Sequence, residues 1–193
     1  TSAWRNAARA LIDGDFAFLL EQERNLAFPL VAAYLNHSDP ELAALANTLV
    51  THLERVPPPA LRIVTLGAFN VWQGTRHVDT RALHKRRAGD LFALLMLTPS
   101  HSLSFDQIAE ALWHNKGLAA ARMLFHHATS TLRRALEPEL PDKFPSRYLL
   151  VDEGQTTLCL PPGSTIDFQT FEEHCRQEEW NVALEIYHGD LLP

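Results

Sequence analysis

The chain has 193 residues, 46% hydrophobic and 21% charged, which is ordinary for a globular protein of one or two domains. No stretch approaches the roughly 18 apolar residues of a membrane-spanning helix, and no charged segment leads an apolar one, so neither a membrane span nor a signal peptide is expected. Cys159 and Cys175 lack CxxC spacing and are interpreted as reduced thiols of a cytoplasmic protein.

The charge is unevenly distributed along the chain. The formal net charge is −6, which by itself argues weakly against a nucleic-acid partner. Residues 81–147, however, hold ten Lys/Arg and six Asp/Glu, whereas the remainder holds seven Lys/Arg and seventeen Asp/Glu. Such asymmetry is typical of a protein in which one domain meets a polyanion. Uneven solvated faces are the plainer alternative.

Residues 1–56 are predicted to be helical. The clearest helix lies in DPELAALANTLVTHLERV, where Asp39 can cap the helix and Pro40 fits its first position. Its leucines recur at helical spacing, at Leu42, Leu45, Leu49 and Leu53. Short helices with short connections suggest the end of a TPR-like helical-repeat region. The VPPPA segment then predicts a semi-rigid linker at residues 57–60.

Residues 61–162 are predicted to form an α+β domain. A hairpin or small meander with a turn at Gln73-Gly74 precedes three helices, and Ser104 with Gln107 gives the second helix a capping box. The short link before the third helix predicts a helix-turn-helix. A second hairpin around Glu153-Gly154 would form a wing. Residues 165–193 are predicted to be a separate helical module, and their abrupt end suggests a fragment.

The third helix, predicted from about residue 118 to 137 and ended by Pro138, has two distinct faces. At 100° per residue, one arc of roughly 120° is apolar and would dock on the domain. It holds Leu124, Phe125, Ala128, Leu132, Ala135 and Leu136. An opposite arc of about 140° is rich in hydrogen-bond donors. It holds Arg122, Met123, His126, His127, Ser130, Arg133 and Arg134, with Thr129 and Thr131 at the borders.

This donor face predicts contact with double-stranded DNA, because a B-form major groove accepts one helix, and Arg, Ser, Thr and His can serve base edges or phosphates. Met123 is interpreted as packing at the groove edge. Lys85, Arg86 and Arg87, which lead into the first helix, are candidates for phosphate contacts. Lys143 and Arg147, which flank the first strand of the wing, are candidates for contacts with phosphate or the minor groove.

Plainer interpretations remain open for these residues. A polar arc on a helix is usually a solvated face, although such a face normally mixes Glu with Lys, and this one is cationic. The charges at 85–87 could be a solvated lead-in, and Lys143 a loop charge. A metal site at His126-His127 is not expected, because paired helical ligands need i, i+4 spacing.

The order of these motifs carries a family resemblance. The segments LRIVTLGAFNVWQGTRHV, KRRAGDLFALLML, DQIAEALW, HHATSTLRRAL and SRYLLV together resemble the OmpR/PhoB-type winged-helix domain, in the version found in SARP-type bacterial transcriptional activators. DFQTFEEHC and ALEIYHGDLLP resemble the start of the bacterial transcriptional activator domain (BTAD), a TPR-like module. The N-terminal helices are similar to helical-repeat regions of large MalT-like ATPases of the STAND class. The resemblance covers roughly residues 61–193.

The resemblance implies a cytoplasmic, nucleoid-associated activator that binds promoter DNA, often as head-to-tail copies on direct repeats, and contacts RNA polymerase. The family pattern ending in LRRAL maps onto residues 132–136. It implies that Ser130, Thr131 and Arg133 face DNA, joined by Arg122, His126 and His127. The chain departs from the family at VDEGQ, an acidic turn where a wing often carries Arg or Lys. No receiver domain precedes the winged helix, so phosphorelay control is not expected.

The sequence bears on three classes of function. A sequence-specific DNA-binding transcriptional regulator is favoured, and a winged-helix protein–protein interaction module in a signalling ATPase is the alternative. An enzyme is not expected, since no Ser/His/Asp arrangement, metal-ligand cluster or GxxxxGK[ST] loop is evident. Neither a cofactor nor a metal is therefore predicted.

Overall fold

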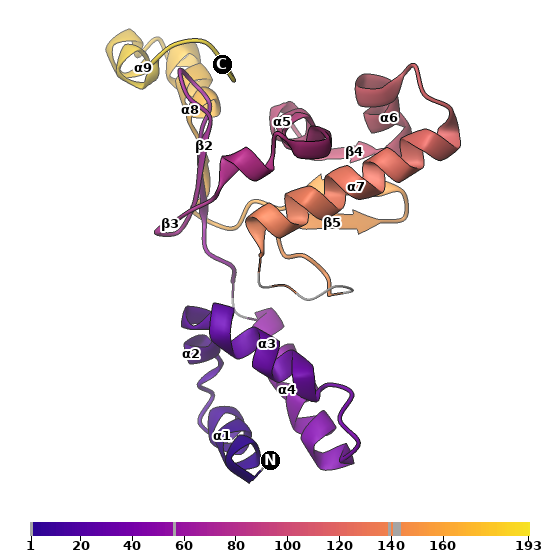
Figure 1. The fold of residues 1–193 in the computed structure, drawn as a ribbon. Coiled ribbons are helices and arrows are strands. Elements are labelled where there is room, and N and C mark those ends of the chain that lie inside the picture. Colours follow the sequence, from indigo (N-terminus) through magenta and orange to yellow (C-terminus); the bar gives the residue numbers. More distant parts are fainter. Residues whose placement is uncertain (1, 56, 139, 141–143) are drawn as a thin grey trace. The chain divides into compact units, whose positions relative to one another are not determined.

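A computed structural model describes residues 2–55, 57–138, 140 and 144–193 (Figure 1). The chain divides into two compact units. The first comprises residues 1–58 together with 139–144, and the second comprises Pro59–Pro138 and Pro145–Pro193. Each unit has its own cluster of buried hydrophobic residues.

The first unit is helical, with α1 (Ser2–Asp13), α2 (Ala17–Gln22), α3 (Arg24–Tyr34) and α4 (Pro40–Arg55). The predicted start of α4 is confirmed, since Oδ1 of Asp39 accepts a hydrogen bond of 3.0 Å from the backbone N–H of Glu41. The predicted leucine stripe faces the core of this unit. Leu42, Leu49 and Leu53 are buried, and Leu45 is partly buried.

Two parts of this core were not predicted. The helix α3 contains Pro29, a residue that removes a backbone hydrogen bond from a helix interior. Tertiary packing outweighs that cost, because Phe28 and Val31 of the same helix are buried. The segment after Pro138 also contributes to this core through Leu140 and Phe144, whose ring packs edge-on against Phe28 with centroids 5.3 Å apart.

The second unit begins with a four-stranded sheet of order β3-β2-β1-β7. Its strands are β1 (Leu61–Val64), β2 (Asn70–Gln73), β3 (Arg76–His77) and β7 (Thr165–Ile166). The predicted meander of β1, β2 and β3 is confirmed, and its second turn contains Gly74 at φ +57°. The parallel partner β7 was not predicted, because two residues are too short to give a strand pattern.

The remaining elements of the second unit alternate helices with a small sheet. They are η1 (Thr80–Ala82), η2 (Lys85–Arg87), α5 (Ala88–Leu97), β4 (Ser102–Ser104), α6 (Phe105–Trp113), α7 (Leu118–Leu136), β5 (Leu149–Asp152), β6 (Gln155–Leu158), α8 (Asp167–Arg176) and α9 (Trp180–Ile186). The strand order of the second sheet is β4-β6-β5. The capping box of α6 is confirmed. Glu153 and Gly154 both have positive φ, as a tight hairpin turn requires.

A single hydrophobic core joins the two sheets of this unit to its helices. The helix α7 packs against α5 and β5 (Figure 1). Fully buried side chains come from α5 (Phe92 and Leu95), from α6 (Ile108) and from the start of the hairpin (Tyr148). The second unit is therefore a mixed α+β fold with small sheets, as the sequence predicted at this level.

Residues 165–193, expected to form a separate module, lie in the second unit. The carboxylate of Asp167 explains much of this attachment, because it accepts hydrogen bonds from the backbone N–H groups of Thr65 and Leu66 and from the Thr65 hydroxyl at 2.6–2.9 Å. A bridge between Leu66 and Leu191 adds a second attachment.

Gly67 makes this second attachment possible. Its φ is +76°, and a Cβ built on it would lie 2.3 Å from the carbonyl oxygen of His188. We expect Gly67→Ala to lower the free energy of unfolding by about 1–3 kcal/mol, because it adds a steric clash to the strain of positive φ. Urea denaturation measures this effect. Gly154→Ala is the matched control, since it has φ +81° but open space, and an equal loss in both variants would contradict the clash.

Candidate nucleic-acid interface

The helix α7 is held by one apolar face. Its sequence contains no Gly or Pro between Leu118 and Leu136, which favours a long continuous helix. The buried residues follow helical spacing, and Phe125, Ala128, Leu132 and Leu136 belong to the predicted docking face. Leu124 and Ala135 of that face are partly buried, and Ala121, which was not predicted, is buried as well. A face anchored along its whole length holds the opposite face in a fixed orientation.

The opposite face of α7 presents the predicted donors. Arg122, His126, His127, Ser130 and Arg134 are exposed, as is Met123. Thr131 and Arg133 are partly buried. The sequence of α7 contains no acidic residue. This surface, formed by Arg122, His126, His127, Ser130, Thr131, Arg133 and Arg134, is called the donor face below.

The N-terminal part of the donor face is held by aromatic packing. The guanidinium carbon of Arg122 lies 5.5 Å from the ring centroid of Phe105, within the range of a cation–π interaction. The Phe105 ring packs edge-on against Phe125 of the buried face, with centroids 5.4 Å apart. Arg122 is therefore linked through two rings to the core of the unit.

The basic segment η2 lies against α7. Arg86 and Arg87 both have left-handed backbone conformations, at φ +57° and +58°. A guanidinium nitrogen of Arg86 lies 3.2 Å from Nδ1 of His127. Because a guanidinium only donates, Nδ1 accepts and the ring presents its N–H at Nε2. The structure thus brings Arg86 together with His127, two residues that were predicted for different contacts.

Arg87 and Lys85, the other two predicted phosphate contacts, differ in whether the unit itself already binds their charge. Arg87 pairs with Asp90 at 2.9 Å and donates to the carbonyl of Leu112 at the end of α6, so its charge is largely used within the unit. Lys85 is exposed. A hollow of about 540 Å³ lies between η2, the end of α6 and α7. Its lining includes Arg86, Arg87, Lys116 and His127.

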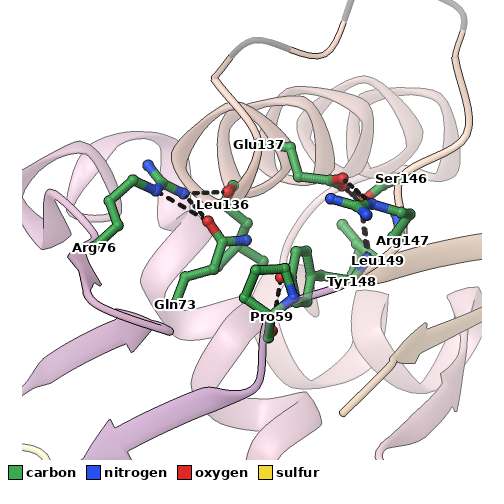
Figure 2. Close-up of polar contacts among 9 residues, drawn as sticks. All are labelled: Pro59, Gln73, Arg76, Leu136, Glu137, Ser146, Arg147, Tyr148 and Leu149. Carbon is green, nitrogen blue, oxygen red and sulfur yellow. Dashed lines mark hydrogen bonds and ion pairs between the residues drawn. The ribbon is translucent and has the colours of Figure 1, made fainter. Parts of the chain in front are cut away.

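Arg147 has a different position from the one predicted. Its side chain is 15% exposed and forms an ion pair of 3.4 Å with Glu137, whose side chain is fully buried (Figure 2). Glu137 also accepts hydrogen bonds from the Ser146 hydroxyl and from the backbone N–H of Arg147. Arg147 therefore joins the end of α7 to the start of the hairpin, and its contact with phosphate or the minor groove stays a prediction. Lys143 lies outside the described residues.

A second arginine, not predicted from the sequence, binds the end of α7. The Arg76 guanidinium donates to the carbonyl of Leu136 at 2.6 Å and to the side-chain amide oxygen of Gln73 (Figure 2). A cation at a helix C-terminus is stabilising, because the last carbonyls carry partial negative charge. The hydroxyl of the buried Tyr148 donates to the carbonyl of Pro59 at 2.8 Å nearby. Arg76 and Glu137 together fix where α7 ends.

No group of three or more His, Cys, Asp or Glu among the described residues is arranged to hold a metal ion. Burial raises the pKa of the Cys159 thiol, which keeps it protonated at neutral pH. No helix in the described part of the chain has the length and apolar character needed to cross a membrane.

No protein-family model and no curated protein sequence matches the chain.

Proposed function

We propose that the second unit is a winged-helix DNA-binding domain of a transcriptional regulator, with α7 in the major groove and the β5–β6 hairpin as the wing. The observation that carries the proposal is the acid-free donor face of α7, opposite a face that is buried from Ala121 to Leu136. A B-form major groove accommodates a helix presented in this way. Promoter DNA is then the ligand, and RNA polymerase and further copies of the chain on direct repeats are the other partners proposed.

The surroundings of α7 support this proposal. The exposed cations Lys85 and Arg86 lie in η2, which packs against α7. Phosphate contacts from this segment would fix the register of the helix on the duplex, and the donor face would then read base edges. The hairpin tip, at Glu153, is acidic and exposed, so insertion of the wing into the minor groove is not part of the proposal.

A protein-binding module is the second candidate. Trp180 and Leu184 of α9 are 57% and 68% exposed and lie one helical turn apart, and neighbouring exposed apolar side chains are typical of protein contacts. Gel shift with DNA from the upstream region of the protein's own gene, at 50 and 200 mM salt, separates the two functions. A DNA-binding domain with about five phosphate-facing cations loses about two to three orders of magnitude in affinity over that range. Absence of retardation at 50 mM favours the protein-binding module.

Single substitutions test the residues of the donor face. Arg133→Ala is expected to weaken binding to a specific site by about 1–3 kcal/mol if it reads a base. Lys85→Ala is expected to weaken binding to all duplexes alike and to reduce the salt slope by about one. Arg176→Ala in α8 removes the same charge away from α7 and is the control. Fluorescence anisotropy measures all three, and an unchanged affinity in Arg133→Ala removes Arg133 from the reading surface.

A further inference from the structure

Exposed apolar side chains lie beside the donor face near the start of α7, and they cannot take part in hydrogen bonds to DNA. Met123 is 56% exposed on α7, although methionine is a residue that normally fills gaps in a core. Leu118, at the first position of the same helix, is 61% exposed, and Ala119 is exposed as well. Met123 was predicted to pack at the edge of the groove, and more than half of its side chain is accessible in the structure.

Met123 lies at the centre of the donor face. At 100° per residue, Met123 and Ser130 are about 20° apart around the helix axis and about 10 Å apart along it. Ala119 lies one turn before Met123 on the same line. The centre of this face is therefore apolar near the start of α7 and polar from His126 onward, with cations on both sides.

We propose that Met123, with Ala119 beside it, contacts the 5-methyl group of a thymine in the major groove. This inference rests on the function proposed above. The thymine methyl is the apolar group that a major groove presents, and apolar side chains recognise it by contact. The charge of the surrounding face argues for DNA as the occupant, because Arg122, Arg133 and Arg134 share this face of an acid-free helix.

The spacing along α7 also limits which bases the two residues share. Met123 and Ser130 are two helical turns apart on one face, so the thymine read by Met123 is expected in a different base pair from the one at which affinity depends on Ser130. Leu118 lies away from the line through Ala119 and Met123, so it is not assigned to this contact.

Uracil tests the inference because it lacks only the methyl group. Duplexes are selected from a random-sequence library with the full chain, and each thymine of the selected duplex is replaced in turn by uracil. At one position we expect a loss of about fourfold in affinity, the value for burial of one methyl group. In Met123→Ala the affinity for the thymine duplex falls by a similar factor, and uracil at that position has no further effect.

Leu97→Ala is the matched control, since Leu97 is also an exposed apolar residue but lies on α5. It should retain the full response to uracil, and circular dichroism of both variants verifies that they fold. Equal binding of thymine and uracil duplexes by the wild-type chain overturns the inference and leaves DNA binding intact. A uracil response that persists in Met123→Ala overturns the assignment to Met123. Failure to enrich any duplex overturns the proposed function itself.

Discussion

Glu137→Ala is expected to lower the free energy of unfolding of the second unit by about 3–5 kcal/mol, the usual cost of removing one partner from a buried ion pair. The Glu137 side chain is fully buried, and the Arg147 guanidinium that pairs with it is 15% exposed. Alanine would remove the buried carboxylate that accepts from the Arg147 guanidinium, from the backbone N–H of Arg147 and from the Ser146 hydroxyl. Chemical denaturation followed by circular dichroism measures the loss.

Glu137→Gln is the matched control for this prediction. A glutamine keeps an oxygen that can accept from Ser146 and Arg147 but removes the negative charge. We expect its loss of stability to be smaller than that of the alanine variant, because the uncharged acceptor still satisfies part of the network. An alanine variant as stable as the wild type would show that the pair contributes nothing to holding the end of α7.

Asp167→Ala has the second-largest expected effect, a loss of about 2–5 kcal/mol. The substitution leaves the backbone N–H groups of Thr65 and Leu66 without acceptors, and each buried unsatisfied group costs about 1–3 kcal/mol. Thr65 is fully buried, so water does not replace the carboxylate there without opening the structure. Amide hydrogen exchange, read by mass spectrometry, should show faster exchange in β1, β7 and α8.

Thr65→Val provides the comparison for Asp167. It removes only the hydroxyl that donates to Asp167 at 2.6 Å and keeps both backbone hydrogen bonds, so its loss should be close to that of one hydrogen bond, about 1–2 kcal/mol. If Asp167→Ala cost no more than Thr65→Val, the two backbone hydrogen bonds would not be what attaches α8 to the sheet.

Elements set by local signals were predictable from the sequence. The capping box at Ser104 and Gln107, the turn at Glu153-Gly154 and the leucine stripe of α4 each depend on residues close together in the chain, and all are present in the structure. The same holds for the buried face of α7, because helical periodicity alone assigns it. Its exposed face was predicted by the same angular placement.

Contacts between distant residues were not predictable. Arg147 was expected to face a ligand because an exposed basic residue beside a hairpin suggests one, but it pairs with Glu137, which is buried at the end of α7. Glu137 carried no sequence signal other than its position before Pro138. The attachment of Asp167 to Thr65 joins residues 102 apart in the chain, and no periodic pattern reports such a contact. The pairing of Arg86 with His127, 41 residues apart, is of the same kind.

The contribution of Leu140 and Phe144 to the first core affects the synthesis and the proteolysis of the protein. Because Leu140 and Phe144 belong to the core of the first unit, that core lacks two of its apolar side chains until the ribosome has synthesised residue 144. By then every residue of α5, α6 and α7 has already been added. A single cleavage between Pro58 and Pro59 therefore does not yield two complete domains. A shortened chain starting at residue 59 would expose Leu140 and Phe144 to solvent, because the core that they pack against would be missing.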